Sequence, residues 1–327
     1  MDKKEAIGLR VGGLLYTPAV NRGVAERVLN EDWPCLTSLS LCLEDAIQDS
    51  GLAAAEKQLQ DTLSTLRRAG RELPLIFIRV RNPRHFLHVH RLLGAEEEIV
   101  CGYIFPKFDE TNAPDYLSLL RRINAGQSHK LFAMPIIESR SAAFGETRRE
   151  TLSFLRSCLG DHQDAILNVR VGGNDFCNLF GLRRNVTQSI YDLGPVRDIL
   201  IDILNWFSMD YIVSGPVWEY YGEDAGGPWA EGLKRELALD QANGFLGKTA
   251  IHPSQLPLIY ESLQVSPQDL ADAEAILNWK DGPLAVAGSA NGGRMNEVKC
   301  HTRWAKKIAA RAKIYGVREA ESHGDRI

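Results

Sequence analysis

Eight short apolar segments, rich in β-branched residues, alternate along this chain with longer segments of helical periodicity. This alternation indicates successive strand–helix units and therefore a parallel sheet. Eight such units is the number that closes a (β/α)8 TIM barrel. The predicted strands are residues 13–17, 38–44, 75–81, 102–107, 131–138, 165–171, 211–214 and 248–252. The sequence thus predicts an α/β protein built on one closed barrel.

The length of the chain leaves residues over after such a barrel. A barrel takes about 250 residues, and the chain has 327. We therefore expect a barrel over residues 1–262 and a C-terminal helical extension, able to act as a lid, over 263–327. A helix is predicted from the capping residue Ser266, and a basic helix over about 298–315. Between them, residues 281–294 are rich in Gly, Ala and Ser, which favours a mobile connection or a lid hinge.

Composition excludes several classes of protein. The 38 basic and 42 acidic residues give a net charge of −4, with no long Lys/Arg block, which argues against a nucleic-acid partner. No apolar run approaches the length of a membrane span, and the first residues lack the apolar core of a secretory signal. The six cysteines form no CxxC pair, so neither a disulfide framework nor a zinc site is indicated. We expect a cytoplasmic protein without a membrane partner.

Polar residues recur where the predicted strands end. In a βα barrel the active site is built at the carboxyl ends of the strands, so these residues are the candidates for function. The strand-end residues are Glu44, Asp45, Arg79, Arg81, Lys107, Glu138, Asp175 and His252. One such residue is readily explained as a helix cap, but a repeated pattern favours a site.

Glu138 and Asp175 are separated by about one strand–helix unit, which predicts that they lie at the mouths of adjacent strands. Two carboxylates with room for water suit Mg²⁺, which prefers oxygen ligands and keeps places for substrate oxygens. A capping or salt-bridged pair is the alternative interpretation.

Arg79 and Arg81 share one strand face, and two guanidinium groups there need partners. They bind a substrate carboxylate or phosphate, or they form salt bridges to Glu44 or Asp45; we favour substrate binding for Arg79 and leave Arg81 open.

Gly172 and Gly173 follow the sixth predicted strand, where a glycine turn lets the backbone approach a ligand closely. The segment lacks the GxGxxG spacing of a dinucleotide site. His252 ends the eighth strand before a proline. It is a candidate for substrate binding, although a lone histidine is more often a hydrogen-bonded structural residue.

Taken in order, the strand-end motifs resemble those of the citrate lyase β-subunit-like, or HpcH/HpaI, family of carbon–carbon bond lyases. The resemblance is greatest to the stand-alone TIM-barrel branch often found beside tellurium-resistance gene clusters. The matching motifs are LYTPA, CLEDAI, FIRVRNP, FPKF, MPIIES, RVGGNDF, GLRR and GKTAIHPSQ, and they span roughly residues 14–280.

The resemblance implies a role for individual residues. The family's magnesium-binding pair falls on Glu138 and Asp175, and its substrate-binding arginine falls on Arg79. Its acidic pair after the second strand falls on Glu44 and Asp45, and the lysine of its PK segment on Lys107. It also implies a homo-oligomer, often a trimer, in which the C-terminal segment covers a neighbour's barrel.

The sequence departs from the family pattern at three places, and at one of them the family's Lys…Ala-Arg signature has no clear counterpart in residues 51–60. Cys42 stands where many members have an aspartate, and Glu297 stands where many have a C-terminal aspartate that reaches a neighbouring site. The leading prediction is a Mg²⁺-dependent carbon–carbon lyase that acts on a 2-oxo acid, hydroxy-acid or acyl-CoA-type substrate through a metal-stabilised enolate. The departures leave two alternatives open, an acyl-CoA thioester hydrolase at the same site and a non-catalytic ligand-binding or regulatory barrel. The general base stays open among Glu44, Asp45, Glu297 and a metal-bound water.

Overall fold

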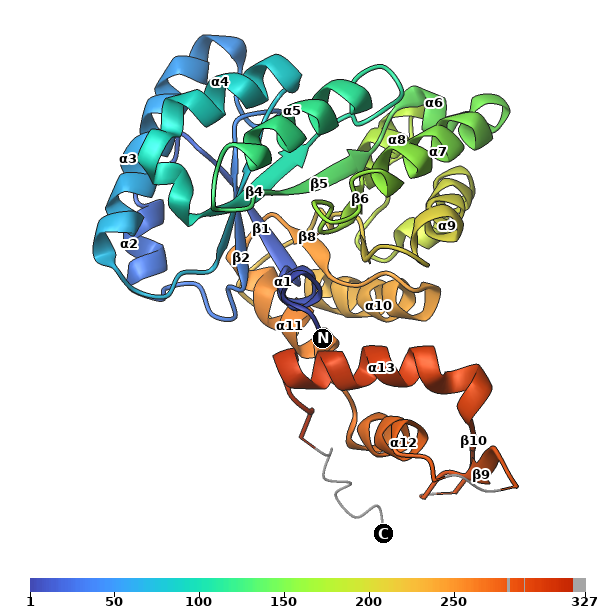
Figure 1. Cartoon of the computed structure of the whole chain (residues 1–327). Helices are drawn as coiled ribbons and strands as arrows, with labels where there is room; N and C mark the ends of the chain where they lie inside the picture. The colour runs from blue at the N-terminus through green and yellow to red at the C-terminus, as the bar shows by residue number, and fades with distance from the viewer. Residues whose placement is uncertain (281–282, 291, 320–327) are drawn as a thin grey trace.

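All eight predicted strands form in the computed structural model, which describes residues 1–280, 283–290 and 292–319 (Figure 1). The strands are β1 (Gly13–Pro18), β2 (Ser38–Cys42), β3 (Leu75–Arg79), β4 (Val100–Phe105), β5 (Phe132–Ile137), β6 (Val169–Val171), β7 (Val213–Ser214) and β8 (Lys248–Ala250). Five of them, β2, β3, β4, β5 and β8, end before the polar residue that closes the predicted run, whereas β6 and β7 begin later than predicted.

These strands make one parallel sheet in the order β7-β6-β5-β4-β3-β2-β1-β8. The two outer strands meet through a parallel bridge between Gly215 and Lys248. The Leu246 amide donates to the Val213 carbonyl at 2.8 Å, and the Gly215 amide to the Gly247 carbonyl at 3.0 Å. These bonds close the sheet, and the predicted (β/α)8 barrel is confirmed.

Helices lie between the strands and cover the outside of the sheet (Figure 1). The α-helices of the barrel are α2 (Val24–Leu29), α3 (Leu52–Ala69), α4 (Pro83–Leu93), α5 (Ala113–Ala125), α6 (Arg140–Ala143), α7 (Gly145–Gly160), α8 (Gly173–Leu179), α9 (Gly194–Phe207), α10 (Pro228–Asn243) and α11 (Leu256–Leu263), with α1 (Lys3–Arg10) before β1. Short 3₁₀ turns are η1 (Asp49–Gly51), η2 (Gly94–Ile99), η3 (Ile190–Asp192) and η4 (Pro253–Gln255). None of the helices in the described ranges is both long and apolar enough to cross a membrane.

The period-two alternation of the strands separates an outer core from an inner one. On β5, Ala133 and Ile137 pack against the helices, whereas Met134 and Ile136 point into the barrel. The inner core is the smaller and also contains Phe77 of β3. Residues two positions further along these inward-facing rows reach the carboxyl mouth of the barrel, which is how the strands present polar side chains there.

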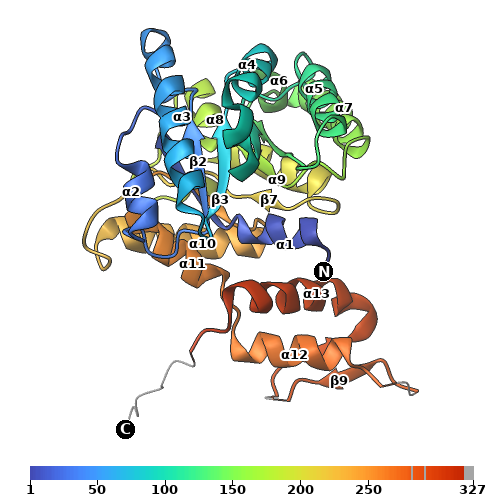
Figure 2. The same cartoon turned by 60° about the vertical axis from the view of Figure 1, so that its left-hand side comes forward.

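The C-terminal extension packs at the opposite end. It consists of α12 (Pro267–Leu277), the hairpin β9 (Val286–Gly288) and β10 (Met295–Glu297), and α13 (Val298–Tyr315). In both views α13 lies beside α1 (Figures 1 and 2). The Tyr315 hydroxyl donates to the Leu9 carbonyl and lies against Gly12, directly before β1. The extension therefore lies at the amino ends of the strands and does not cover this chain's own barrel mouth.

Two details of the extension refine the sequence-based expectations. The Ser266 hydroxyl accepts from the Asp269 amide at 3.0 Å, so the predicted cap of α12 is confirmed. The connection predicted over 281–294 contains β9, although residues 281, 282 and 291 lie outside the described residues. Glu297 is the last residue of β10, within the C-terminal extension. That it reaches the site of a neighbouring subunit stays a prediction.

Candidate active site

The carboxyl mouth of the barrel brings together side chains from the ends of β2, β3 and β5. Arg79, the last residue of β3, points inward because it continues the row of Phe77. Its Nη2 lies 2.8 Å from Glu44 Oε2 and 3.1 Å from Asp45 Oδ2, both just after β2. The same nitrogen is 3.6 Å from Glu138 Oε1, just after β5. One buried guanidinium thus holds three carboxylates, and its Nε has no partner among the described residues.

Lys107 joins the same group through both its backbone and its side chain. Its φ of 47° lies in the left-handed region, which a residue with a Cβ adopts only at a cost. In this conformation its amide donates to Glu138 Oε1 at 2.8 Å. Its Nζ bridges Glu44 Oε1 at 2.5 Å and Asp45 Oδ1 at 2.9 Å. The strained turn therefore fixes the orientation of the Glu138 carboxylate.

Because Gly172 has no side chain, the Glu138 carboxylate can lie against its backbone. A Cβ on Gly172 would lie 2.2 Å from Glu138 Oε2 and 2.3 Å from Glu138 Cβ. The sequence predicted that a ligand approaches the backbone at this glycine turn. In the structure the Glu138 carboxylate occupies that space. Only the absence of a side chain at position 172 permits that approach.

The environment of Glu138 favours its neutral form when no cation is present. Burial raises its pKa to about 8, with Arg79 opposing the shift and the nearby charge of Asp175 adding to it. Asp175 lies in the first turn of α8, so the two carboxylates predicted to be adjacent do interact. A cation bound beside the two carboxylates would offset the repulsion between their negative charges.

The donor set fits magnesium. Within residues 1–280, 283–290 and 292–319, no group of three or more His, Cys, Asp or Glu side chains forms a closed metal cage. Two carboxylates without a soft ligand match a hard cation that completes its coordination with water or substrate oxygens. Glu138 and Asp175 are thus the residues that would hold such an ion.

Glu44 and Asp45 differ in their affinity for a proton although they are neighbours. Burial raises the pKa of Glu44, against the attraction of Arg79. The pKa of Asp45 is lowered: its partial burial opposes this, but hydrogen bonds to Glu44 and Lys107 outweigh it. Of the two, Glu44 is the stronger base.

Three other predicted site residues have partners within the scaffold. Arg81 turns away from the mouth: its Nε donates to the Leu43 carbonyl at 2.8 Å and its Nη1 pairs with Asp49. It therefore holds the loop after β2. A Cβ on Gly173 would lie 2.6 Å from Ile190 Cδ1, so this glycine serves packing. His252 caps η4 by accepting from the Ser254 amide, and its ring stacks on another aromatic ring.

Comparisons with known proteins agree with this geometry. The model of the C–C bond lyase family of the TIM-barrel fold matches residues 5–317. The chain belongs to this family. The family expected from the motifs is thus confirmed. A search of curated proteins found no significant match.

Solved structures with the same fold include several citrate lyase-like proteins. A citrate lyase from Burkholderia xenovorans LB400 superposes with a TM-score of 0.70 at 15% identity, covering 95% of this chain and 94% of that one. CitE from Mycobacterium tuberculosis, in complex with magnesium, acetoacetate and coenzyme A, gives 0.63 at 19% identity, covering 93% and 100%. The citrate lyase β-subunit from M. tuberculosis, complexed with oxaloacetate and magnesium, gives 0.54 at 20%, covering 78% and 98%. At these identities the likeness shows the fold.

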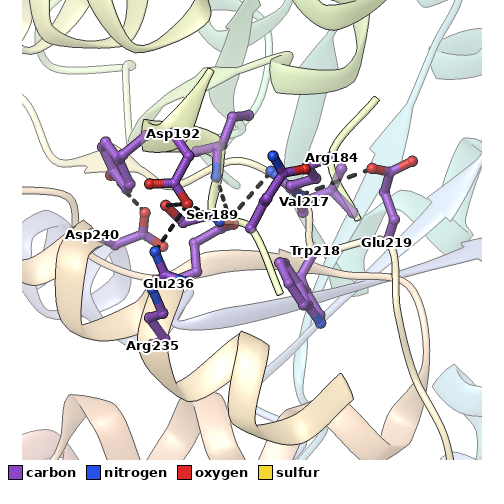
Figure 3. A network of polar contacts seen from close by, with 12 residues as sticks. Arg184, Ser189, Asp192, Val217, Trp218, Glu219, Arg235, Glu236 and Asp240 are labelled. Carbon is purple, nitrogen blue, oxygen red and sulfur yellow. Dashed lines mark hydrogen bonds and ion pairs between the residues drawn. The ribbon is translucent and has the colours of Figure 1, made fainter. Parts of the chain in front are cut away.

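This lyase-family chain also contains a second buried charged cluster, outside the mouth (Figure 3). Arg184 Nη1 lies 3.3 Å from Glu236 Oε2, and Lys248 Nζ lies 2.9 Å from Glu236 Oε1 and 2.7 Å from Asp240 Oδ2. Two cations face two carboxylates, and the Tyr191 hydroxyl donates to Asp240 at 2.7 Å. The cluster is balanced and ties α10 and η3 to β8, so we assign it to the scaffold.

Sequence reasoning missed two residues that face the mouth from other strands. Tyr16 of β1 is partly exposed, and Arg79 Cζ lies 5.7 Å from the centroid of its ring. Arg170 of β6 is 1% exposed and donates through Nη2 to Thr249 Oγ1 at 2.7 Å. Both residues lie within strands, and the sequence analysis considered only polar residues at the ends of strands. Period-two alternation from Leu14 and Gly172 would have placed both in the barrel interior.

Proposed function

We propose that this chain cleaves or forms a carbon–carbon bond next to a carbonyl, in a 2-oxo acid, hydroxy-acid or acyl-CoA-type substrate, with Mg²⁺ as its cofactor. The observation that carries the proposal is the placement of Glu138. This carboxylate is buried at the barrel mouth, oriented by the Lys107 amide, admitted by Gly172 and in electrostatic contact with Asp175. Glu138 is buried beside a second carboxylate, Asp175, and a buried carboxylate is costly unless a positive charge compensates it.

The chemistry divides between the cation and the residues of the chain. Glu138 and Asp175 would hold Mg²⁺, which would supply positive charge to stabilise the enolate form of the substrate's carbonyl group. Arg79 attracts the substrate carboxylate through the positive charge of its guanidinium group. Glu44 takes the hydroxyl proton in the direction of cleavage, because its raised pKa makes it a better base than Asp45.

Lys107 supports this proton transfer without moving. Its Nζ contacts both Glu44 and Asp45, so it compensates the negative charge of whichever carboxylate is ionised. Hydrogen bonds to these two residues raise the pKa of Lys107, although its partial burial opposes the shift. The lysine therefore stays a cation throughout, which suits an electrostatic role rather than a covalent one.

The bound molecules named for the solved neighbours guide the choice of test substrates. CitE was crystallised with acetoacetate and coenzyme A, and the citrate lyase β-subunit with oxaloacetate. We therefore propose incubation with Mg²⁺ and a panel of 2-oxo acids, 4-hydroxy-2-oxo acids and acyl-CoAs, followed by mass spectrometry. Pyruvate or glyoxylate as a product supports the lyase. Free coenzyme A alone favours the thioester hydrolase, and binding without turnover favours the regulatory barrel.

The metal assignment has its own test. Glu138→Ala and Asp175→Ala should each remove Mg²⁺ binding in calorimetry, whereas Asp161→Ala, which removes an exposed carboxylate at the end of α7, should leave it unchanged. Unchanged Mg²⁺ affinity in both site variants would refute the assignment.

A further inference from the structure

Arg170 is a buried cation that no carboxylate among the described residues balances. Its side chain is 1% exposed. Nη2 donates to Thr249 Oγ1 at 2.7 Å, whereas Nε and Nη1 have no hydrogen-bond partner in the described part of the chain. Burying a charge without an opposite charge is destabilising, and buried donors without an acceptor add to the cost. Such an arrangement indicates that a negatively charged group binds there.

A comparison with Arg184 shows what is unusual about Arg170. Both side chains are 1% exposed, and each has two nitrogens without a hydrogen-bond partner among the described residues. Glu236 Oε2, however, lies 3.3 Å from Arg184 Nη1 (Figure 3), and Glu219 Oε2 lies 3.9 Å from its Nε. No carboxylate oxygen of the described chain lies within 4.0 Å of an Arg170 nitrogen. The fold thus supplies acids to an arginine of the scaffold and none to Arg170.

The guanidinium of Arg170 lies inside the barrel. Arg170 belongs to β6 and Thr249 to β8, and β7 stands between these strands, so the hydrogen bond that joins them crosses the barrel interior. Arg170 also pairs in register with Ile136, whose side chain points inward. Two residues further along these two strands, or about 6.6 Å, Gly172 lies against the Glu138 side chain at the mouth. Arg170 therefore lies one inward-facing position below the proposed metal site.

Solvent reaches the interior beside this guanidinium. Thr249 faces inward, because Lys248 before it points outward to Glu236 of α10 and because its register partner Leu14 belongs to the inner core. Thr249 is nevertheless partly exposed. There is thus open space next to the residue that Arg170 contacts, and a small ligand in that space would meet the guanidinium.

The charges at the mouth leave the negative charge of a substrate to be balanced. A bound Mg²⁺ and the side chains of Arg79 and Lys107 together carry four positive charges. They face the four carboxylates of the mouth, which are Glu44, Asp45, Glu138 and Asp175. The site with its metal is therefore neutral before a substrate enters. A substrate carboxylate adds a negative charge, and Arg170 is the cation below the site that has no acid of its own.

We propose that Arg170 is a second substrate-binding arginine, whose Nε and Nη1 donate hydrogen bonds to an anionic oxygen of the substrate while Nη2 stays bound to Thr249. The inference rests on the proposed function and deepens it. Arg79 attracts the substrate to the mouth, and Arg170 balances the charge that the substrate brings. Among the proposed substrate classes this favours a small 2-oxo acid with a single carboxylate, because one unpaired arginine balances one carboxylate.

The test compares Arg170→Met with the matched control Arg184→Met in the full-length chain. Each substitution removes the guanidinium group of a side chain that is 1% exposed and keeps an unbranched apolar side chain in its place. Calorimetry measures the affinity for pyruvate at saturating Mg²⁺ and, separately, the affinity for Mg²⁺. The thermal midpoint of the ligand-free protein is recorded for every variant.

We expect Arg170→Met to weaken pyruvate binding about tenfold or more, as for the loss of a hydrogen bond to a charged group. Its affinity for Mg²⁺ should not fall, because both carboxylates that would hold the metal remain. Its thermal midpoint should fall less than that of Arg184→Met, since only Arg184 has a carboxylate partner to lose. Arg184→Met should bind pyruvate as the wild type does.

Each other outcome overturns the inference. Unchanged pyruvate affinity in Arg170→Met, or an equal loss in Arg184→Met, removes the proposed contact. A loss of Mg²⁺ affinity in Arg170→Met would assign the residue to the metal site, and a thermal midpoint as low as that of Arg184→Met would assign it to the scaffold.

Failure of the proposed function gives a different result. If only this inference is wrong, the wild-type protein binds pyruvate in the presence of Mg²⁺ and Arg170→Met binds it equally well. If the wild-type protein binds Mg²⁺ but no pyruvate, the 2-oxo acid assignment of the proposed function fails together with this inference.

Discussion

Binding of Mg²⁺ should release a proton from Glu138. Because the pKa of this carboxyl is about 8 without a cation, about nine-tenths of the molecules carry the proton at pH 7. A metal ligand has to be deprotonated, so binding at pH 7 should release about 0.9 proton per site, falling to about 0.1 at pH 9. The apparent affinity for Mg²⁺ should therefore rise about tenfold per pH unit below pH 8 and level off above it.

Calorimetry in two buffers of different ionisation enthalpy measures this release directly. The observed heat of Mg²⁺ binding should differ between two non-chelating buffers at pH 7 and become nearly equal between two such buffers at pH 9. Asp175→Asn removes a charge that raises the pKa of Glu138, so proton release at pH 7 should fall together with the affinity. Heats that do not depend on the buffer at pH 7, with binding intact, would refute the reasoning that burial keeps Glu138 protonated.

The same pKa predicts how stability changes with pH in the metal-free protein. The folded protein retains the proton of Glu138 up to about pH 8, whereas the unfolded chain loses it near the usual value of 4.5. The folded state therefore binds more protons in this window, and the free energy of unfolding should fall as pH rises from 4.5 to 8. Denaturant titrations of Glu138→Gln should show a flatter dependence on pH, and an equal slope in both proteins would contradict the assignment.

Three substitutions test other parts of the site. Gly172→Ala places a Cβ 2.2 Å from Glu138 Oε2 and should lower Mg²⁺ affinity in calorimetry by at least about tenfold, whereas Gly194→Ala, with no atom within 4 Å, should have no effect. Lys107→Gly should be about 1 kcal/mol more stable in urea than Lys107→Ala, because only glycine adopts a φ of 47° freely; equal stabilities would exclude strain there. Arg81→Met should lower the free energy of unfolding by about 1–3 kcal/mol, since buried carbonyls lose their donor, and yet leave Mg²⁺ affinity unchanged; a lost affinity would return Arg81 to the binding site.

Much of this protein could be read from local sequence patterns. Apolar runs of strand length, separated by helical periodicity, determined the number and order of the strands, because backbone alternation is a property of neighbouring residues. The same patterns placed Glu44, Arg79, Lys107 and Glu138 at strand ends, and parallel strands bring such ends to one mouth. The structure confirms that these four side chains are in contact.

What the sequence alone left undetermined depends on contacts between segments far apart in the chain. Arg79 and Arg81 look equivalent on one strand, but Arg81 lies beyond the last ladder bond and turns to the loop carbonyls, while Arg79 stays inside. Likewise, Gly172 is a turn residue in sequence and becomes the surface against which Glu138 lies. Arg170 of β6 donates to Thr249 of β8 only because closure of the barrel brings these strands around one interior. Local periodicity decides which way a side chain points, and only the closed tertiary structure decides which other side chain it meets.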